Sequence, residues 1–182
     1  IFEAVRNSIQ QLPARLFWAH NNVLIIGEET ARRGVSELID FFERDGETRH
    51  DVMIVVAEGC TANHMLKAAY ELDDQPGMQM VEHIRFVRGS LSTTLAIDLH
   101  EFLIRLNSPG TAALAVRMKP MYKQPIDLPG ELIREDIGLT PIVGGLAVFR
   151  NNRMVGWLEP LAARGLLWLT GETRGGLMVV ED

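Results

Sequence analysis

The sequence predicts an α/β fold in which a mixed β-sheet is flanked by α-helices in a single domain. Two continuous apolar runs, Val23–Ile26 and Val52–Ala57, have the composition of buried strands and lie on either side of a helical segment. A strand, a helix and a second strand at this spacing form a βαβ unit with parallel strands. Farther along, two apolar runs flank a turn of two asparagines, which predicts an antiparallel hairpin.

The composition is that of a folded domain with an acidic surface. Of the 182 residues 47% are hydrophobic, which is enough for one sizeable core. The net charge of −6 argues against a nucleic-acid-binding protein, which normally presents a basic face. No apolar run reaches the ~20 residues of a membrane span. The chain does not begin with Met and opens within a predicted helix, so we expect a fragment of a longer protein.

Helices and strands alternate in the first half of the chain. Helices are predicted, in order, over residues 1–12, 28–44, 62–72, 78–87 and 95–106. Thr61 is placed to cap the third of these helices, because a threonine oxygen can accept a hydrogen bond from the first turn. Pro76-Gly77 is expected to break the chain before the fourth helix. The last helix has the clearest amphipathic pattern, so its apolar side should face the sheet.

The span of residues 107–141 differs in character from the rest of the chain. It contains five of the eight prolines. Residues 112–118 predict a strand at the edge of the sheet, and the remainder is longer and more irregular than an ordinary connection. Such a span is typical of a functional loop or of an excursion over the surface. One hypothesis is that this Pro-rich loop lines a pocket for a small ligand.

Residues 144–176 carry the densest pattern in the chain. Asn151-Asn152 suits the turn of the hairpin, since asparagine tolerates positive φ. Pro160 suits the first position of a helix. That helix is predicted to have a broad apolar side, formed by Leu161, Ala162, Gly165, Leu166, Trp168 and Leu169. A glycine within a helix costs about 1 kcal/mol relative to alanine, so we expect another group to pack close to Gly165. A further strand is predicted over residues 177–180.

The chain contains little that predicts catalysis. Cys60 and His64 are four residues apart near a helix start, where a thiol pKa can be lowered, so a hydrolase that uses this pair is one alternative. The sequence places no third group that would orient His64. The five histidines lack metal-ligand spacing, and the paired glycines form no phosphate-binding motif. We therefore expect no enzyme activity, no metal and no cofactor.

Arg164, Trp168 and Trp157 are the candidate interaction residues. Filling the core is one interpretation of the tryptophans. The alternative is that some of them are partly exposed anchors for a partner, because Trp and Arg are enriched at interface hot spots. Arg164 lies one turn before Trp168, and its simpler role is a local ion pair with Glu159 or Glu172.

Four blocks of sequence resemble the N-terminal domain of the Ger(x)C spore germination family, the lipoprotein C subunits of bacterial germinant receptors. The blocks are IFEAVRN, RLFWAHNNVLIIGEETARRGV, LIDFFERDGETRHDVMIVVAEG and GGLAVFRNNRMVGWLEPLAARGLLWLTGETRGG, and they cover most of the chain. The family usually carries an acidic turn before the Arg-Gly pair of the last block, whereas this chain has Leu161-Ala162-Ala163 there. We therefore expect the partner of Arg164 to lie elsewhere in the fold or on another subunit.

The resemblance implies a mixed α/β domain over residues 1–182, the first of several domains in a lipoprotein. It implies an upstream signal peptide with a lipidated cysteine, and attachment to the outer face of the spore inner membrane. It also implies a place beside integral-membrane A and B subunits in a receptor that senses nutrients, with no catalytic residues. The resulting hypothesis is a non-enzymatic receptor domain that acts through protein–protein contacts. Direct binding of a nutrient stays open.

Overall fold

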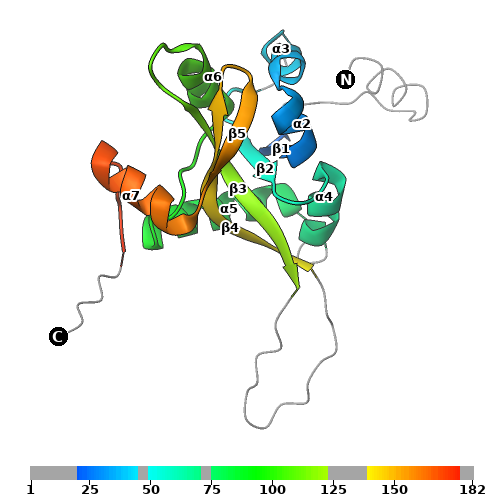
Figure 1. Cartoon of the computed structure of the whole chain (residues 1–182). Coiled ribbons are helices and arrows are strands. Elements are labelled where there is room, and N and C mark those ends of the chain that lie inside the picture. The colour runs from blue at the N-terminus through cyan, green and yellow to red at the C-terminus, as the bar shows by residue number, and fades with distance from the viewer. Residues whose placement is uncertain (1–19, 45–48, 71–74, 123–138, 177–182) are drawn as a thin grey trace, which may run out of the picture.

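Five strands form one mixed sheet at the centre of the protein (Figure 1). The computed structural model describes residues 20–44, 49–70, 75–122 and 139–176. The strands are β1 (Val23–Gly27), β2 (Met53–Ala57), β3 (Ala113–Tyr122), β4 (Leu139–Arg150) and β5 (Arg153–Leu158). They lie in the sheet in this same order. The predicted α/β class with a mixed sheet is confirmed.

The strand pairing contains both of the predicted supersecondary units. β1 pairs with β2 and β2 with β3 in parallel, whereas the β3–β4 and β4–β5 pairs are antiparallel. In the hairpin, Arg150 faces Arg153 across the predicted turn, and Asn151 has a φ of 57°. β4 begins at Leu139, well before the predicted start, because β3 is long enough to pair with it along its whole length.

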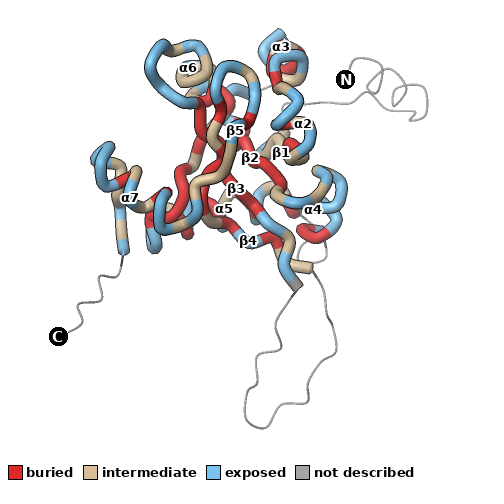
Figure 2. The backbone as a smooth tube through the Cα atoms, viewed as in Figure 1, coloured by how far each residue is buried: buried red, intermediate tan, exposed pale blue. Residues whose placement is uncertain are grey.

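Helices cover both faces of the sheet. One layer consists of α2 (Glu28–Arg33), α3 (Ser36–Arg44), α6 (Leu99–Asn107) and α7 (Pro160–Thr170), and the other of α4 (Ala62–Tyr70) and α5 (Pro76–Ser90). The side chains of β2 alternate between the two layers, as the pleat of a strand requires. Ile54 and Val56 pack with the first layer, and Met53, Val55 and Ala57 with the second. The central strands are accordingly largely buried, together with the sides of the helices that face them (Figure 2).

The helix predicted over residues 28–44 is divided into α2 and α3. Gly34 has a φ of 141°, a conformation that only glycine adopts readily, and the helix ends there. The N–H of Val35 donates to the carbonyl of Asn152 at 2.9 Å, so the break binds the turn of the β4–β5 hairpin. The break was not apparent from the sequence, because Ala31 before Gly34 and Val35, Ile39 and Phe42 after it have the spacing of one continuous helix.

Two predictions about the Pro-rich span are wrong. The strand predicted at the sheet edge is β3, the central strand, and its residues 113–118 are buried. Pro120 of β3 faces Pro141 of β4, so both prolines lie within paired strands and not in a loop. They are tolerated there because the β3–β4 pair continues beyond the last residues that β2 pairs with. Residues 123–138 lie outside the described residues.

The other helices of the first half form with shifted boundaries. Thr61 caps α4 as predicted, its Oγ1 accepting the N–H of His64 at 3.2 Å. α5 begins at Pro76 and includes the Pro76-Gly77 pair that was expected to precede it, because proline is favoured in the first turn of a helix. α6 begins at Leu99, so Leu95 lies before the helix in a buried extended segment.

β1 lies at one end of the described sheet. As predicted, its two faces are covered, because Leu24 and Ile26 pack with the first helix layer and Val23 and Ile25 with the second. Val23–Ile25 are nevertheless only half-buried. The predicted helix of residues 1–12 and the predicted strand of residues 177–180 lie outside the described residues. None of the described helices combines the length and the apolar character needed to cross a lipid bilayer.

Candidate protein interface

Helix α7 is apolar on two opposite sides. Ala163 and Leu167 face the sheet and are fully buried. The opposite side is exposed and is called the α7 face here; it consists of Leu161, Ala162, Gly165, Trp168 and Leu169. The exposed fraction is 78% for Leu161, 58% for Trp168 and 89% for Leu169. A monomeric domain rarely leaves so many large apolar side chains together in solvent, which marks this face as a candidate contact surface.

The sequence predicted a broad apolar side of α7 and left open whether Trp168 fills the core or is an exposed anchor; Trp168 is exposed. The predicted apolar side contains Leu161 and Trp168, which are exposed, whereas the sheet contacts a narrower stripe at Ala163 and Leu167. With apolar residues on both sides, periodicity does not distinguish the buried side from the exposed one. The prediction that another group packs close to Gly165 is wrong among the described residues, since a Cβ placed there would meet nothing within 4 Å.

Arg164 binds a part of the chain that its local sequence does not reveal. Its Nε donates to the carbonyl of Leu91, just beyond α5, at 3.1 Å. Glu159 and Glu172, the two carboxylates considered as its partners, bind other arginines. The partner of Arg164 therefore lies elsewhere in the fold, and the contact ties the middle of α7 to the segment after α5.

A buried arginine connects the start of α7 to the sheet. Arg117 of β3 is 8% exposed; it donates to both carboxylate oxygens of Glu58, at 2.8 and 2.9 Å, and to Glu159 at 2.6 Å. Burial by itself lowers the pKa of this guanidinium, but the bonds to Glu159 and Glu58 outweigh it and raise the pKa. Gly145 leaves room for the Arg117 side chain, since a Cβ at this position would lie 3.3 Å from the Cδ and Nη1 atoms of Arg117 and would also clash with the carbonyl oxygen of Leu158.

Sequence reasoning missed this cluster, although one signal was available. Arg117 is a charged residue within the otherwise apolar run of residues 113–118, and a buried charge requires a partner. Its partners lie 59 residues earlier and 42 residues later in the chain. No local spacing reveals a contact between residues so far apart.

Trp157 lies beside this cluster in a partly buried position on β5. The Arg117 guanidinium carbon is 5.5 Å from the centroid of its ring. Nearby, Glu28 at the start of α2 accepts the N–H of Gly59 and the Nε–H of Arg32, each at 2.9 Å. The bond from Gly59 is the main cause that lowers the pKa of the Glu28 carboxyl. Trp157 is therefore part of a polar cluster within the fold, in contrast to the exposed Trp168.

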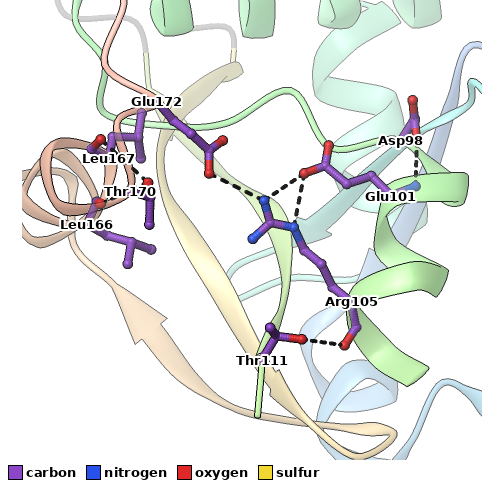
Figure 3. A network of polar contacts seen from close by, with 8 residues as sticks. All are labelled: Asp98, Glu101, Arg105, Thr111, Leu166, Leu167, Thr170 and Glu172. Atoms are coloured by element: carbon purple, nitrogen blue, oxygen red, sulfur yellow. Dashed lines mark hydrogen bonds and ion pairs between the residues drawn. The ribbon is translucent and has the colours of Figure 1, made fainter. Parts of the chain in front are cut away.

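A second arginine holds the end of α7 (Figure 3). Arg105 of α6 donates to Glu101 at 2.7 Å and to Glu172, just after α7, at 3.4 Å. The N–H of Glu172 donates to the carbonyl of Leu167 at 2.8 Å and closes the helix. α7 is thus attached at its start, middle and end, so the α7 face is presented in a defined orientation.

The chain that follows α7 runs back along the end of α5. The Oγ of Ser92 accepts the N–H groups of Arg174 at 3.1 Å and Gly175 at 2.9 Å. Ser92 is fully buried and has a φ of 48°. Two residues on, the Thr94 hydroxyl donates to the carbonyl of Gly145 in β4 at 3.1 Å. This buried segment therefore joins α5, β4 and the chain after α7.

The Cys60–His64 alternative finds no support in the geometry. Burial raises the pKa of the Cys60 thiol, and the negative charge of Glu28 raises it further. A nucleophilic cysteine requires the opposite shift. His64 is exposed on α4.

His50 and His100 lie together, which their sequence spacing did not indicate. Their rings stack with centroids 6.4 Å apart, and both residues are exposed. Across residues 20–44, 49–70, 75–122 and 139–176, no three His, Cys, Asp or Glu side chains are grouped so as to hold a metal ion.

The beginning of the Pro-rich span lines a surface pocket together with the hairpin turn. This pocket of about 490 Å³ is bounded by residues 106–112 and 149–151. A second pocket of about 500 Å³ lies over α4 and α5, where Met80, His83 and Phe86 line it with Pro141. None of the buried polar or charged side chains of the described residues lines either pocket. The two pockets therefore add no buried polar group that would select a ligand, and residues 123–138 of the proposed loop lie outside the described residues.

Two family models match the chain in succession. The model described as the spore germination protein N-terminal domain matches residues 1–119. This chain belongs to the Ger(x)C family of spore germination proteins. The model described as the spore germination B3/GerAC-like C-terminal region matches residues 144–182. The resemblance to the Ger(x)C family is thus confirmed, although the fourth sequence block, which was assigned to the N-terminal domain, lies in the segment that matches the C-terminal model.

Individual relatives agree with this assignment. Spore germination protein KC of Bacillus subtilis (strain 168) is 25% identical over 180 residues, which are 93% of this chain and 42% of KC. YfkR of the same strain is 23% identical over 163 residues, 90% of this chain and 39% of YfkR. The crystal structure of the GerBC protein shares the fold with a TM-score of 0.58 and 18% identity, over 97% of this chain and 45% of GerBC. The chain therefore spans less than half the length of these relatives.

The segments matched by the two family models meet within one sheet. β1 and β2 lie in the segment matched by the N-terminal model, whereas β5 and α7 lie in the segment matched by the C-terminal model. β4 joins the two by pairing with β3 on one side and β5 on the other. The Arg117–Glu159 ion pair also links the two segments.

Proposed function

We propose that the chain is a non-catalytic domain of a spore germinant receptor and takes part in nutrient-triggered germination through protein–protein contacts. Its family membership supports a role in germination. The observation that carries the mode of action is the α7 face, where Trp168 is 58% exposed between two leucines that are exposed still further. Exposed aromatic and aliphatic side chains on a fixed helix are typical of contact surfaces.

The family resemblance suggests the setting of these contacts. The proposed partners in the receptor are integral-membrane A and B subunits, and the proposed location is the outer face of the spore inner membrane. A lipid anchor upstream of this chain would hold the subunit there. The raised pKa of Cys60 is consistent with a role that does not involve catalysis by this thiol.

A germination assay tests the proposal directly. Spores would carry the full-length gene with Trp168→Ser and Leu169→Ser, and a matched control with Ile104→Ser on α6. Ile104 is 53% exposed and lies outside the α7 face, so it controls for the loss of an exposed apolar side chain. The measurements are the rate of nutrient-triggered loss of optical density and the amount of the protein in the spore membrane.

We expect the Trp168 and Leu169 variant to germinate at least several-fold more slowly than the control at an equal amount of protein, because an interface anchor typically contributes 2 kcal/mol or more. A normal response of this variant to every nutrient that engages the receptor, with the protein present, would contradict the contact role of the α7 face.

A further inference from the structure

The α7 face has the composition of a helix side that is buried in the complete protein. A helix that is apolar all round is normally enclosed on all sides. α7 contains one charged residue, Arg164, and that residue binds the carbonyl of Leu91. Within the part of the chain that the structure describes, the sheet covers Ala163 and Leu167 and leaves the α7 face in solvent.

The shape of the α7 face is that of a surface prepared for close contact. Gly165 lies one turn from both Leu161 and Leu169, so the three stand in one row with the glycine in the middle. Apart from its two neighbours in sequence and the adjacent backbone of α7 itself, no group of the described residues comes within 4 Å of a Cβ at Gly165. The row therefore has a notch between two exposed leucines, beside Trp168. A neighbouring segment can approach the helix backbone there and contact these side chains at the same time.

The family comparisons indicate which segment this is. α7 belongs to residues 144–182, the part of the chain that matches the C-terminal family model. KC, YfkR and GerBC are all more than twice as long as the part of each that this chain covers. α7 thus lies in the segment that matches the C-terminal model and has an uncovered apolar side, while the relatives contain further chain.

We propose that the α7 face is the docking surface for the C-terminal portion of the same polypeptide in the full-length protein. The inference rests on the proposed function only in taking the α7 face to be a contact surface, and it assigns this contact to the same polypeptide in place of another subunit. A portion of the same polypeptide is tethered to α7, and a short tether gives an effective concentration of about millimolar, so an apolar contact of modest area is sufficient. The polar contacts of Glu159 and Glu172 hold α7 in place before docking, which reduces the entropy lost.

Hydroxyl-radical footprinting tests this inference. The oxidation rate of Trp168 is measured by mass spectrometry in this chain alone and in the full-length product of its gene, purified without other subunits. Phe86 of α5, which is 67% exposed, is the internal control. We expect the oxidation of Trp168 to be several-fold slower in the full-length protein, and the oxidation of Phe86 to be unchanged.

A pair of glycine substitutions provides a test that does not depend on removing apolar contacts. Gly165→Leu fills the notch, and Gly89→Leu on α5 is the matched control, because a Cβ at either glycine meets nothing within 4 Å. Leucine has the higher helix propensity, so both variants of this chain alone should keep or raise Tm, by about 2–4 °C. In the full-length protein only Gly165→Leu should restore rapid oxidation of Trp168.

The possible outcomes separate this inference from the proposed function. Slow oxidation of Trp168 in the isolated full-length protein, reversed by Gly165→Leu, supports the inference. Rapid oxidation in the isolated protein with protection only in receptor-containing spore membranes overturns the inference and retains the proposed function. Rapid oxidation in both settings overturns both. A gene product that extends no farther than this chain would also overturn the inference.

Discussion

Helices α6 and α7 pack on the same face of the sheet, yet they differ on their outer sides. α6 buries Leu99 and Phe102 and exposes polar residues such as His100 and Asn107, with Ile104 as its one exposed large apolar side chain. α7 buries a narrow stripe and exposes the apolar α7 face. The contacts of this domain thus explain the apolar inner side and the polar outer side of α6. For α7 they explain only the buried stripe and not the apolar outer side.

The two helices also begin differently. Asp98 caps α6 locally, its carboxylate accepting the N–H of Glu101 at 2.8 Å. Glu159 precedes α7 without capping it through its side chain, and instead binds Arg117 on β3. α6 is therefore defined by its own sequence, whereas the position of α7 depends on a distant strand. A helix that is placed by tertiary contacts and apolar on its outer side is suited to join one part of a protein to another.

The largest expected effects come from the side that the two helices share, the side facing the sheet. Phe102 packs edge-on against Phe149 at a centroid distance of 5.1 Å, and both residues are buried. We expect Phe102→Ala to lower the free energy of unfolding by about 3–5 kcal/mol and Leu167→Ala by about 2–5 kcal/mol. Urea denaturation at neutral pH measures both.

Ile104→Ala is the control for these core substitutions and should change the free energy of unfolding by about 0.5 kcal/mol or less, since the side chain is half exposed. If Leu167→Ala were equally mild, α7 would not be part of the core and the comparison with α6 would fail.

A smaller effect is expected at the attachment of α7 to β3. Arg117→Met removes a buried charge and leaves two carboxylates without their partner, so we expect a loss of about 3 kcal/mol. Glu159→Gln should cost about 1 kcal/mol or less, because the Glu159 side chain is 67% exposed and Glu58 still pairs with the arginine. Thermal and urea unfolding of the two variants measure the difference.

The double variant Arg117→Met, Glu58→Gln is the control for the charge imbalance and should recover part of the loss. An Arg117→Met protein as stable as the parent would show that the ion pairs are not needed to hold α7 to the sheet.

The smallest effect is the pH dependence that Glu28 contributes. Its pKa in the folded protein is lowered, chiefly by the Gly59 N–H, from an ordinary value of 4.5. The stabilisation is therefore complete above pH 4.5 and is lost as the pH falls through the lower folded pKa. Glu28→Gln should flatten the part of the stability profile below pH 4.5, by less than about 1 kcal/mol, as acid and urea denaturation of the two proteins measure. If Glu28→Gln left the dependence of stability on acidic pH unchanged, Glu28 would not contribute to that dependence.

Much of the fold followed from local patterns. The βαβ unit, the Asn151 hairpin, the Thr61 cap and the start of α7 at Pro160 were predicted because each depends on residues close together in the chain. The family was also recognisable from the sequence blocks. These features share a cause: apolar periodicity and the conformational preferences of Pro, Asn and Thr act over a few residues.

Other features depended on contacts between distant segments. The break at Gly34 is bound by the hairpin turn, the centrality of β3 depends on its two neighbours, and Arg117 finds its carboxylates far away in sequence. The hydrophobic periodicity also did not show which side of α7 is buried, because both sides are apolar. By itself the sequence determined the local elements and the family. Only the tertiary structure decided which apolar side meets the sheet and which remains for a partner, because burial depends on what lies opposite a side chain and not on the side chain alone.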